Sequence, residues 1–155
     1  MFSDTLEKIL IIDDDRSFAD ALAARLTAMG METKVLCDPL EGMDMLRDGL
    51  YGIVVVDPDK NISVIEEISG SIRHAVILAT AKFDSIESSA HALKVGAVDQ
   101  IPENLVPGQL ETIIRRAIDR RNLLMETVKL KRRIAVLSVL AGVCFLCGFL
   151  VFYLS

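Results

Sequence analysis

Short runs of β-branched residues alternate with helix-like segments along most of this chain, and that alternation restricts the folds it can adopt. The apolar runs at 9–12 and 53–56 are continuous rather than interrupted by polar residues, which is typical of strands buried on both faces. Such strands need helices on both sides of a parallel sheet. The sequence therefore predicts an α/β fold of five βα units, with strands at 9–12, 33–36, 53–56, 76–79 and 98–101.

Between these strands, apolar residues recur at helical spacing, and residues typical of helix starts and ends flank the segments. Asp38 followed by Pro39 is typical of a helix start, and Gly30 is typical of a helix end. The last helix has no clear breaker before Arg133. It either continues beyond the domain or breaks at Arg121–Asn122, where polar residues crowd and Asn is a poor helix former. The expected helices are 17–28, 39–48, 62–69, 85–94 and 108–121.

Charge divides the chain into an acidic part and a basic part. Residues 1–114 hold 9 Lys or Arg against 20 Asp or Glu, whereas residues 115–133 hold 8 against 2, which gives −11 and +6 of the net −5. A nucleic-acid surface would need clustered basic residues on the folded part, so we expect no nucleic-acid partner. A chain of 155 residues has room for one domain at 7–121 and a basic helical segment at 122–133, followed by an apolar end.

The segment Ile134–Leu154 contains no charged residue. As a helix, its 21 residues would span about 31 Å, close to the hydrocarbon thickness of a bilayer. The basic run Lys129–Arg133 precedes it, which by the positive-inside rule places the N-terminal domain on the cytoplasmic side. We therefore expect a single-pass membrane protein with a transmembrane helix at 134–154, inserted after translation as in tail-anchored proteins. A buried core helix is the alternative.

Small residues share one face of that expected helix. Ser138, Ala141, Cys144 and Gly148 recur at spacings of three and four, where a second helix could approach closely. A homodimer through this helix, or through the last helix of the domain, is therefore one alternative; the other is that small residues are simply common in membrane helices. Cys144 and Cys147 lack the two further ligands that a zinc site needs. The three cysteines of the chain form no disulfide framework, which fits a reducing compartment.

Acidic residues follow two of the expected strands. Asp13, Asp14 and Asp15 follow the first strand, and Asp57 follows the third. If these strands are neighbours, their carboxyl ends bring the acids into one pocket, where Mg²⁺ would relieve the repulsion between them. A carboxylate beside such an ion can attack a phosphoryl group. Thr80 follows the fourth strand and places a hydroxyl at the same edge. The alternative is a set of solvated acids at strand ends.

The chain resembles the receiver domain of bacterial response regulators from Lys8 to about Arg121. The matching motifs are ILIIDDD at 9–15, VVVD at 54–57, VILATA at 76–81 and GAVDQIP at 96–102. This resemblance implies a flavodoxin-like, doubly wound parallel sheet with the strand order 2-1-3-4-5.

The resemblance also implies roles for the acids and the hydroxyl. Asp57 would be the phosphoacceptor, and Mg²⁺ would be held by Asp13, Asp14, Asp57 and the backbone carbonyl of Asp59. Thr80 would be the switch hydroxyl. The implied partner is a histidine kinase or a phosphotransfer protein, and the membrane would be the bacterial inner membrane.

Three positions depart from the receiver pattern. Receivers carry Lys-Pro after the fifth strand, where the Lys contacts the phosphoryl group, but Glu103 and Asn104 stand here, and Gln100 replaces the aromatic switch residue. Lys60 or Lys82 could supply the missing cation. The segment after Asp57 also lacks Met-Pro and reaches Thr80 several residues early, which predicts a shortened third-helix region.

Two functions are compatible with these features. The first is a membrane-tethered, single-domain receiver of a two-component phosphorelay, phosphorylated at Asp57, whose output is binding to an as yet unidentified protein. The second is a degenerate pseudo-receiver that serves as a phosphorylation-independent membrane scaffold or dimerisation module. We expect no enzyme, because His74 and His91 have no evident nucleophile partner and no glycine-rich phosphate loop is present.

Overall fold

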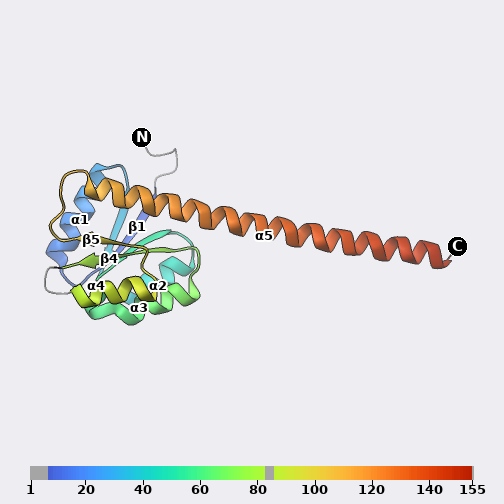
Figure 1. Ribbon diagram of the computed structural model, residues 1–155, viewed down its shortest axis with the longest axis horizontal. Coiled ribbons are helices and arrows are strands. Elements are labelled where there is room, and N and C mark those ends of the chain that lie inside the picture. Colours follow the sequence, from blue (N-terminus) through green and yellow to red (C-terminus); the bar gives the residue numbers. More distant parts are fainter. Residues whose placement is uncertain (1–6, 83–85, 155) are drawn as a thin grey trace. The chain divides into compact units, whose positions relative to one another are not determined.

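The computed structural model describes the backbone of residues 7–82 and 86–154, with the side chains of 86, 145 and 147–154 left out (Figure 1). The strands are β1 (Lys8–Ile12), β2 (Glu32–Leu36), β3 (Ile53–Val56), β4 (Val76–Ala81) and β5 (Asp99–Pro102). The helices are α1 (Arg16–Ala28), α2 (Pro39–Arg47), α3 (Pro58–Ser71), α4 (Ile86–Val95) and α5 (Gln109–Leu154).

The five strands form one parallel sheet in the order β2-β1-β3-β4-β5. This arrangement confirms the predicted five-stranded, flavodoxin-like fold and its strand order. Every residue of β3 is buried, and β1 is buried from Ile9 to Ile12, because helices cover both faces of the sheet as the continuous apolar runs predict.

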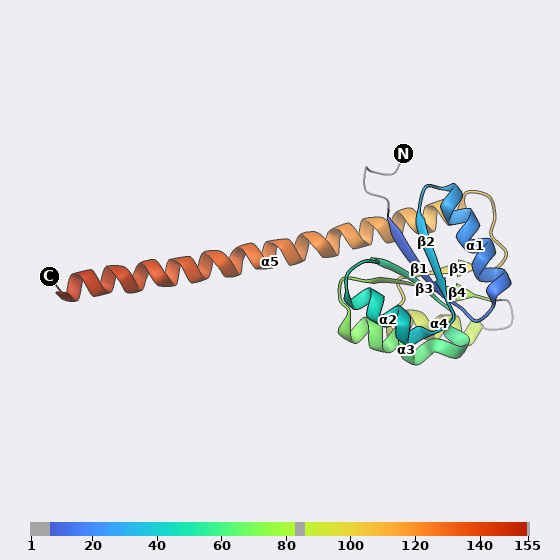
Figure 2. The ribbon, with the colours of Figure 1, turned by 180° about the vertical axis from the view of Figure 1, so that it is seen from behind.

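Helices divide between the two faces of the sheet (Figures 1 and 2). α2, α3 and α4 lie on one face, and α1 lies on the other with the part of α5 that ends at Arg121. Alternate strand residues such as Leu10, Val54 and Ile77 pack in one cluster with Met43, Leu46, Val64, Ile65, Ile68 and Ala92 from α2, α3 and α4. The side-chain period of two in a strand sends the intervening residues to the opposite face.

The start of α3 differs from the sequence-based expectation of a shortened helix beginning at 62. The helix begins at Pro58, because Asp57 caps it and Pro58 occupies a first-turn position, where a missing N–H costs nothing. Asn61 has non-helical backbone angles and marks a kink between this first turn and the rest of α3. Asp38 and Pro39 start α2 in the same way, as predicted. Ser85, the predicted first residue of the fourth helix, lies outside the described residues.

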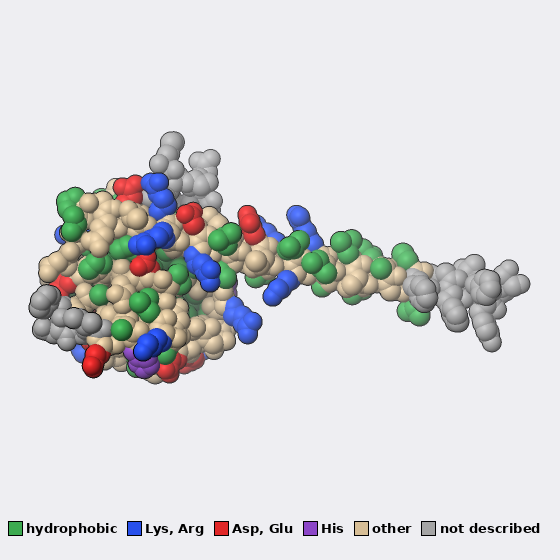
Figure 3. Space-filling view, viewed as in Figure 1, with side chains coloured by type: hydrophobic (Ala, Val, Ile, Leu, Met, Phe, Trp, Pro, Cys, Tyr) green, Lys and Arg blue, Asp and Glu red, His purple; other side chains and the backbone are tan. Residues whose placement is uncertain are grey.

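The chain divides into two compact units, residues 1–121 and 122–155. A single helix, α5, is assigned from Gln109 to Leu154, so no helix end occurs at Arg121–Asn122. In the second unit, large apolar side chains are exposed along the helix, among them Leu123, Leu130 and Leu137 (Figure 3).

The predicted transmembrane helix at 134–154 gains no support from the structure. Within the described part of the chain, no helix is both long enough and apolar enough to cross a membrane. The side chains at 145 and 147–154, nearly half of the predicted span, lie outside the described part of the chain.

Candidate functional site: an acidic pocket at the ends of β1, β3 and β4

Two buried carboxylates meet where β1 and β3 end. Ile12 of β1 pairs with Val56 of β3, so the next residues, Asp13 and Asp57, leave the sheet side by side. The backbone N–H of Asp57 donates to the carbonyl oxygen of Ile12 at 3.2 Å, which extends the pairing by one residue. The exposed fractions of Asp13 and Asp57 are only 1% and 2%. The parallel register therefore brings together two charges that would repel each other without a cation.

Backbone N–H groups fix the orientation of both carboxylates. Asp57 Oδ1 accepts a hydrogen bond from the N–H of Asp59 at 3.1 Å, as the cap of α3. Asp13 Oδ1 accepts one from the N–H of Asp15 at 2.8 Å, and Asp15 in turn caps α1 through the N–H of Phe18 at 3.1 Å. These short loops leave Asp57 Oδ2 and Asp13 Oδ2 available for other partners.

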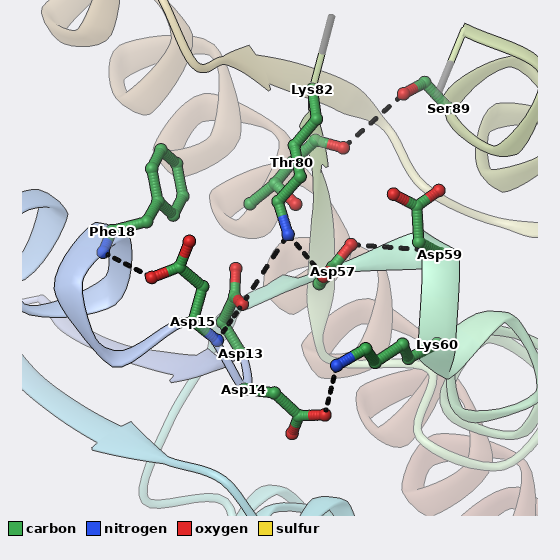
Figure 4. Close-up of polar contacts among 10 residues, drawn as sticks. All are labelled: Asp13, Asp14, Asp15, Phe18, Asp57, Asp59, Lys60, Thr80, Lys82 and Ser89. Atoms are coloured by element: carbon green, nitrogen blue, oxygen red, sulfur yellow. Dashed lines mark hydrogen bonds and ion pairs between the residues drawn. The ribbon is translucent and has the colours of Figure 1, made fainter. Parts of the chain in front are cut away.

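Lys82 supplies a cation between the two acids (Figure 4). Its Nζ atom lies 2.6 Å from Asp57 Oδ2 and 3.9 Å from Asp13 Oδ1. The residue follows β4 and stands two positions after Thr80, so the alternation of side chains along a strand directs both toward the same side. The Lys82 side chain is 25% exposed, which makes this a largely desolvated contact rather than a surface ion pair.

The pKa values of two pocket groups are raised. Burial raises the pKa of the Asp13 carboxyl, and the charges of Asp57 and Asp15 add to that effect, against the N–H of Asp15 and the ammonium of Lys82. Burial, the largest single influence on Lys82, lowers its pKa, but the hydrogen bond to Asp57 and the negative charges of Asp13, Asp57 and Asp15 together bring that pKa above the ordinary value. Lys82 therefore stays charged at neutral pH.

Asp14 lies at the rim of the pocket and pairs with a different lysine. Its Oδ2 atom is 3.1 Å from Nζ of Lys60, and the two side chains are 46% and 64% exposed. The predicted convergence of three carboxylates is therefore only partly correct, because Asp13 and Asp57 share Lys82 whereas Asp14 turns to Lys60. Among the described residues, no group of three or more His, Cys, Asp or Glu is placed to hold a metal ion.

Two buried oxygens in the pocket have no hydrogen-bond partner within the described residues: Asp13 Oδ2 and Thr80 Oγ1. Thr80 is 1% exposed, and its carbonyl oxygen accepts a hydrogen bond from Ser89 Oγ of α4 at 3.5 Å. An unpartnered carboxylate oxygen beside a second carboxylate is the kind of donor that a hard cation such as Mg²⁺ takes. The residues therefore fit Mg²⁺ in type, although Lys82 would have to share Asp57 with it.

The three positions that depart from the receiver pattern belong to β5 and the residues that follow it, next to the end of β4, where the N–H of Glu103 donates to the carbonyl oxygen of Ala81 at 3.0 Å. Gln100 is half-buried on β5, opposite Ala79 of β4. Glu103 and Asn104 are exposed, and Glu103 borders a small cavity beside Phe18 and Arg25 of α1. The two carboxylate oxygens of Asp57 bond to the N–H of Asp59 and to Lys82 rather than to Glu103.

The sequence predicts that the acids and the hydroxyl follow strand ends, and it leaves Lys60 and Lys82 as alternatives for the nearby cation. Lys60 and Lys82 were equal candidates, and the structure assigns Lys60 to Asp14 and Lys82 to Asp57. The signal that favours Lys82 is its place two residues after Thr80, on the same side of an extended segment.

Similar proteins were found both by sequence and by structure, whereas no family model matches the chain. An NtrX-like response regulator of Rickettsia felis is 24% identical over 142 residues, which cover 88% of this chain and 30% of that protein. The DNA-binding response regulator MtrA of Mycobacterium bovis is 30% identical over 120 residues, which cover 75% of this chain and 52% of that protein. The chain therefore spans from about a third to half of the length of these relatives.

One solved structure has the same fold, and its whole length corresponds to about three quarters of this chain. The receiver domain protein of Clostridium thermocellum has a TM-score of 0.68 and 23% identity, and the match covers 77% of this chain and 99% of that one. At this identity the likeness concerns the fold. Together with the sequence relatives, the strand order and the acids at the ends of β1 and β3, it supports the interpretation of the first unit as similar to the receiver domains of response regulators in two-component systems.

Proposed function

We propose that this chain is a membrane-tethered receiver that accepts a phosphoryl group on Asp57 and acts by binding another protein. The observation that carries the proposal is the buried Asp57 carboxylate with a charged lysine at 2.6 Å. The carboxylate is oriented by the N–H of Asp59 and lies beside a second acid. A fixed nucleophile next to a fixed cation is what phosphoryl transfer to a carboxylate requires.

In the proposed transfer, a carboxylate oxygen of Asp57 attacks the phosphorus of a phosphohistidine in a donor kinase. A P–O bond forms as the P–N bond breaks, and the imidazole nitrogen keeps the bonding electrons. Lys82 offsets the negative charge on the phosphoryl oxygens and on Asp13, which is the role that Lys has after β5 in the proteins this chain resembles. Its ammonium already contacts the Asp57 carboxylate at 2.6 Å.

Asp13, Asp57, Asp14 and the backbone carbonyl of Asp59 are the residues that would hold Mg²⁺. The bound ion would neutralise charge on the transferring oxygens. Asp13 Oδ2 is the atom best prepared for it, because it is buried and has no other partner among the described residues. Asp14 would have to turn from Lys60 toward the pocket, which is a modest change for a side chain that is 46% exposed.

Thr80 is the proposed switch. Its buried hydroxyl has no hydrogen-bond partner within the described part of the chain and stands at the same edge as Asp57. A phosphoryl oxygen on Asp57 would give that hydroxyl an acceptor. Ser89 of α4 donates a hydrogen bond to the carbonyl oxygen of Thr80, so a shift of Thr80 would move α4. The surface of α4 is therefore where we propose that partner binding changes.

The decisive experiment is phosphorylation of the full chain by acetyl phosphate with Mg²⁺, read by intact mass. We expect one phosphoryl adduct, absent in Asp57→Asn and retained in the matched control Asp59→Asn, because only the backbone of Asp59 has a proposed role. Beryllofluoride should give a Mg²⁺-dependent spectral change in the same set. If the unaltered chain gains no adduct and shows no spectral change, the phosphoacceptor proposal is wrong.

A second candidate function is a pseudo-receiver scaffold that works without phosphorylation. The same ion pair favours it, because Lys82 already neutralises Asp57 and Asp13 and could hold the pocket permanently in one state. Capture of membrane partners by the unaltered chain and by Asp57→Asn separates the two functions. Equal capture supports the scaffold, whereas loss of capture in a folded Asp57→Asn variant supports the phosphorylated receiver.

The membrane attachment included in this proposal depends on the sequence of the second unit. Segment 134–154 carries no charge, and Lys129, Lys131, Arg132 and Arg133 precede it. We expect the full chain to stay with bacterial inner membranes after alkaline carbonate washing, with the domain on the cytoplasmic side. A chain that ends at Arg133 is the matched control and should be released. Release of both chains would remove this part of the proposal.

A further inference from the structure

The helix of the second unit carries a heptad seam that the receiver function does not use. Residues 123, 127, 130, 134, 137, 141 and 144 follow one another at alternating spacings of four and three. The residues of this seam are Leu123, Thr127, Leu130, Ile134, Leu137, Ala141 and Cys144. Leucine occupies three successive d positions and Cys the fourth, and the a positions hold Thr, Ile and Ala. Leu123, Leu130, Ile134 and Leu137 are 58%, 59%, 58% and 65% exposed.

This seam is distinguished from the other faces of the same helix. Every other register with alternating spacings of three and four between 122 and 141 contains a charged residue, because Glu126, Lys129, Lys131, Arg132 and Arg133 lie outside this one. A sustained seam of period 3.5 is what two helices need in order to supercoil around each other.

The polar member of the seam is already satisfied. Thr127 occupies an a position, and its Oγ1 atom donates a hydrogen bond to the carbonyl oxygen of Leu124 at 2.7 Å. Thr127 can therefore enter an apolar interface without leaving an unpaired buried donor, which would otherwise oppose association.

The charges beside the seam complement a second copy of the same helix. With Thr127 at a and Leu130 at d, Glu126 falls at g and Lys131 at the following e, the two positions that form ion pairs between parallel strands. Arg133, at the next g, faces Ser138 rather than another cation. Lys129 and Arg132 fall at c and f, on the outer side. The basic cluster therefore places no like charges directly across the interface.

We infer that two copies of this chain associate through the seam Leu123–Cys144 as a parallel, in-register, two-stranded coiled coil, with Glu126 of each copy paired to Lys131 of the other. The occupant of the exposed apolar face is thus a second copy of the chain. Association of this kind would hold two receiver domains on one scaffold. Residues 134 to 144 of the seam belong to the segment proposed to enter the membrane, so this part of the association would take place in lipid. Because the association requires neither Mg²⁺ nor phosphorylation, its failure and the failure of phosphorylation at Asp57 are distinguishable.

Disulfide cross-linking of the full chain in mild detergent tests the seam. The native cysteines Cys37, Cys144 and Cys147 are first replaced by Ser, and single cysteines are then placed by Leu130→Cys, Leu137→Cys, Lys129→Cys and Arg132→Cys. We expect the two d positions to cross-link to themselves at least tenfold more than the c and f positions. Self-linking at d also reports the parallel register. Equal cross-linking at all four positions, or none at the d positions, overturns the proposal.

A charge exchange tests the partner pairing without relying on cysteine. Glu126→Lys should weaken the dimer about tenfold, because two ion pairs become two repulsive pairs. The double variant Glu126→Lys with Lys131→Glu should restore the original affinity, measured by energy transfer between labelled copies. Helix content by circular dichroism controls for local unfolding. Failure of the double variant to restore affinity in helices of unchanged content overturns the proposed register. Asp57→Asn should leave every result unchanged, which separates this inference from the receiver function.

Discussion

The ammonium of Lys82 lies 2.6 Å from Oδ2 of Asp57, and it reaches this carboxylate from β4 rather than from the loop after β5. Receivers place a lysine after β5 for this purpose, whereas the present chain has Glu103 there. Because both Asp57 and Asp13 are almost fully buried, the position of this one charge governs the stability of the pocket, its affinity for cations and its chemistry.

Loss of the Lys82 charge should destabilise the domain. Lys82→Met leaves two buried carboxylates uncompensated, and we expect a loss of about 2 kcal/mol in the free energy of unfolding, less than for a fully buried pair because Lys82 is partly exposed. Lys60→Met is the matched control and should change stability by less than about 0.5 kcal/mol, since its pair with Asp14 is solvated. Urea unfolding in EDTA measures both. Equal effects would contradict the assigned role of Lys82.

The same substitution should tighten binding of Mg²⁺. A cation in the pocket and Lys82 compete for Asp57, so removal of the ammonium removes like-charge repulsion near the ion. We expect Lys82→Met to lower the Kd for Mg²⁺ about tenfold in calorimetric titration. Lys8→Met serves as the control, because Lys8 pairs with Glu32 at the opposite end of β1. An unchanged Kd in Lys82→Met would mean that the ion, if it binds, does not contact Asp57.

Stability should depend on pH through Asp13. Its pKa in the folded protein is raised above the ordinary 3.8, so the folded state binds the proton more tightly than the unfolded state. The stability contribution of this group is therefore greatest below pH 3.8 and is lost as the pH rises through the folded pKa. Asp13→Asn removes that loss, and we expect it to stabilise the metal-free protein at pH 7 by about 1 kcal/mol.

The comparison variant for this pH prediction is Asp14→Asn, because Asp14 is exposed. Thermal unfolding in EDTA from neutral pH down to the ordinary carboxyl pKa of 3.8 should show the gain of Asp13→Asn shrinking as the pH falls, with little change in Asp14→Asn. If the stability gain of Asp13→Asn grew toward acid pH instead, its sign would be opposite to the prediction. Burial of the Asp13 carboxylate would then not be the cause of the gain.

The unpartnered hydroxyl of Thr80 gives a fourth prediction. Thr80→Val keeps the shape of the side chain and removes a buried polar atom that has no hydrogen-bond partner in the described residues. We expect it to stabilise the unphosphorylated protein by up to about 1 kcal/mol. Thr112→Val is the control and should be destabilising, since Thr112 Oγ1 donates to the carbonyl oxygen of Gly108 at 3.1 Å. Chemical denaturation measures the free energy of unfolding of both variants. Destabilisation by Thr80→Val would mean that the Thr80 hydroxyl has a hydrogen-bond partner in the folded protein.

Much of the fold could be predicted because its determinants are local. Continuous apolar runs predicted a sheet covered on both faces, and Asp38 with Pro39 predicted the start of α2. The start of α3 is harder to predict, because Asp57 is both an acid at a strand end and the cap of the following helix. Asp57 follows β3, caps α3 and faces the pocket, and helical periodicity does not reveal the first turn of α3.

The sequence by itself determined that Asp13 and Asp57 follow buried strands. They meet because β1 and β3 are neighbours in the parallel sheet, whose register aligns the two strand ends. Only the tertiary structure decided which cation they share. Lys60 and Lys82 both have side chains long enough to reach the pocket, and their partners depend on the direction in which α3 and the end of β4 present them. Side-chain direction at a strand end depends on packing between elements distant in the sequence, so tertiary contacts gave Lys82 to Asp57 and left Asp14 at the rim.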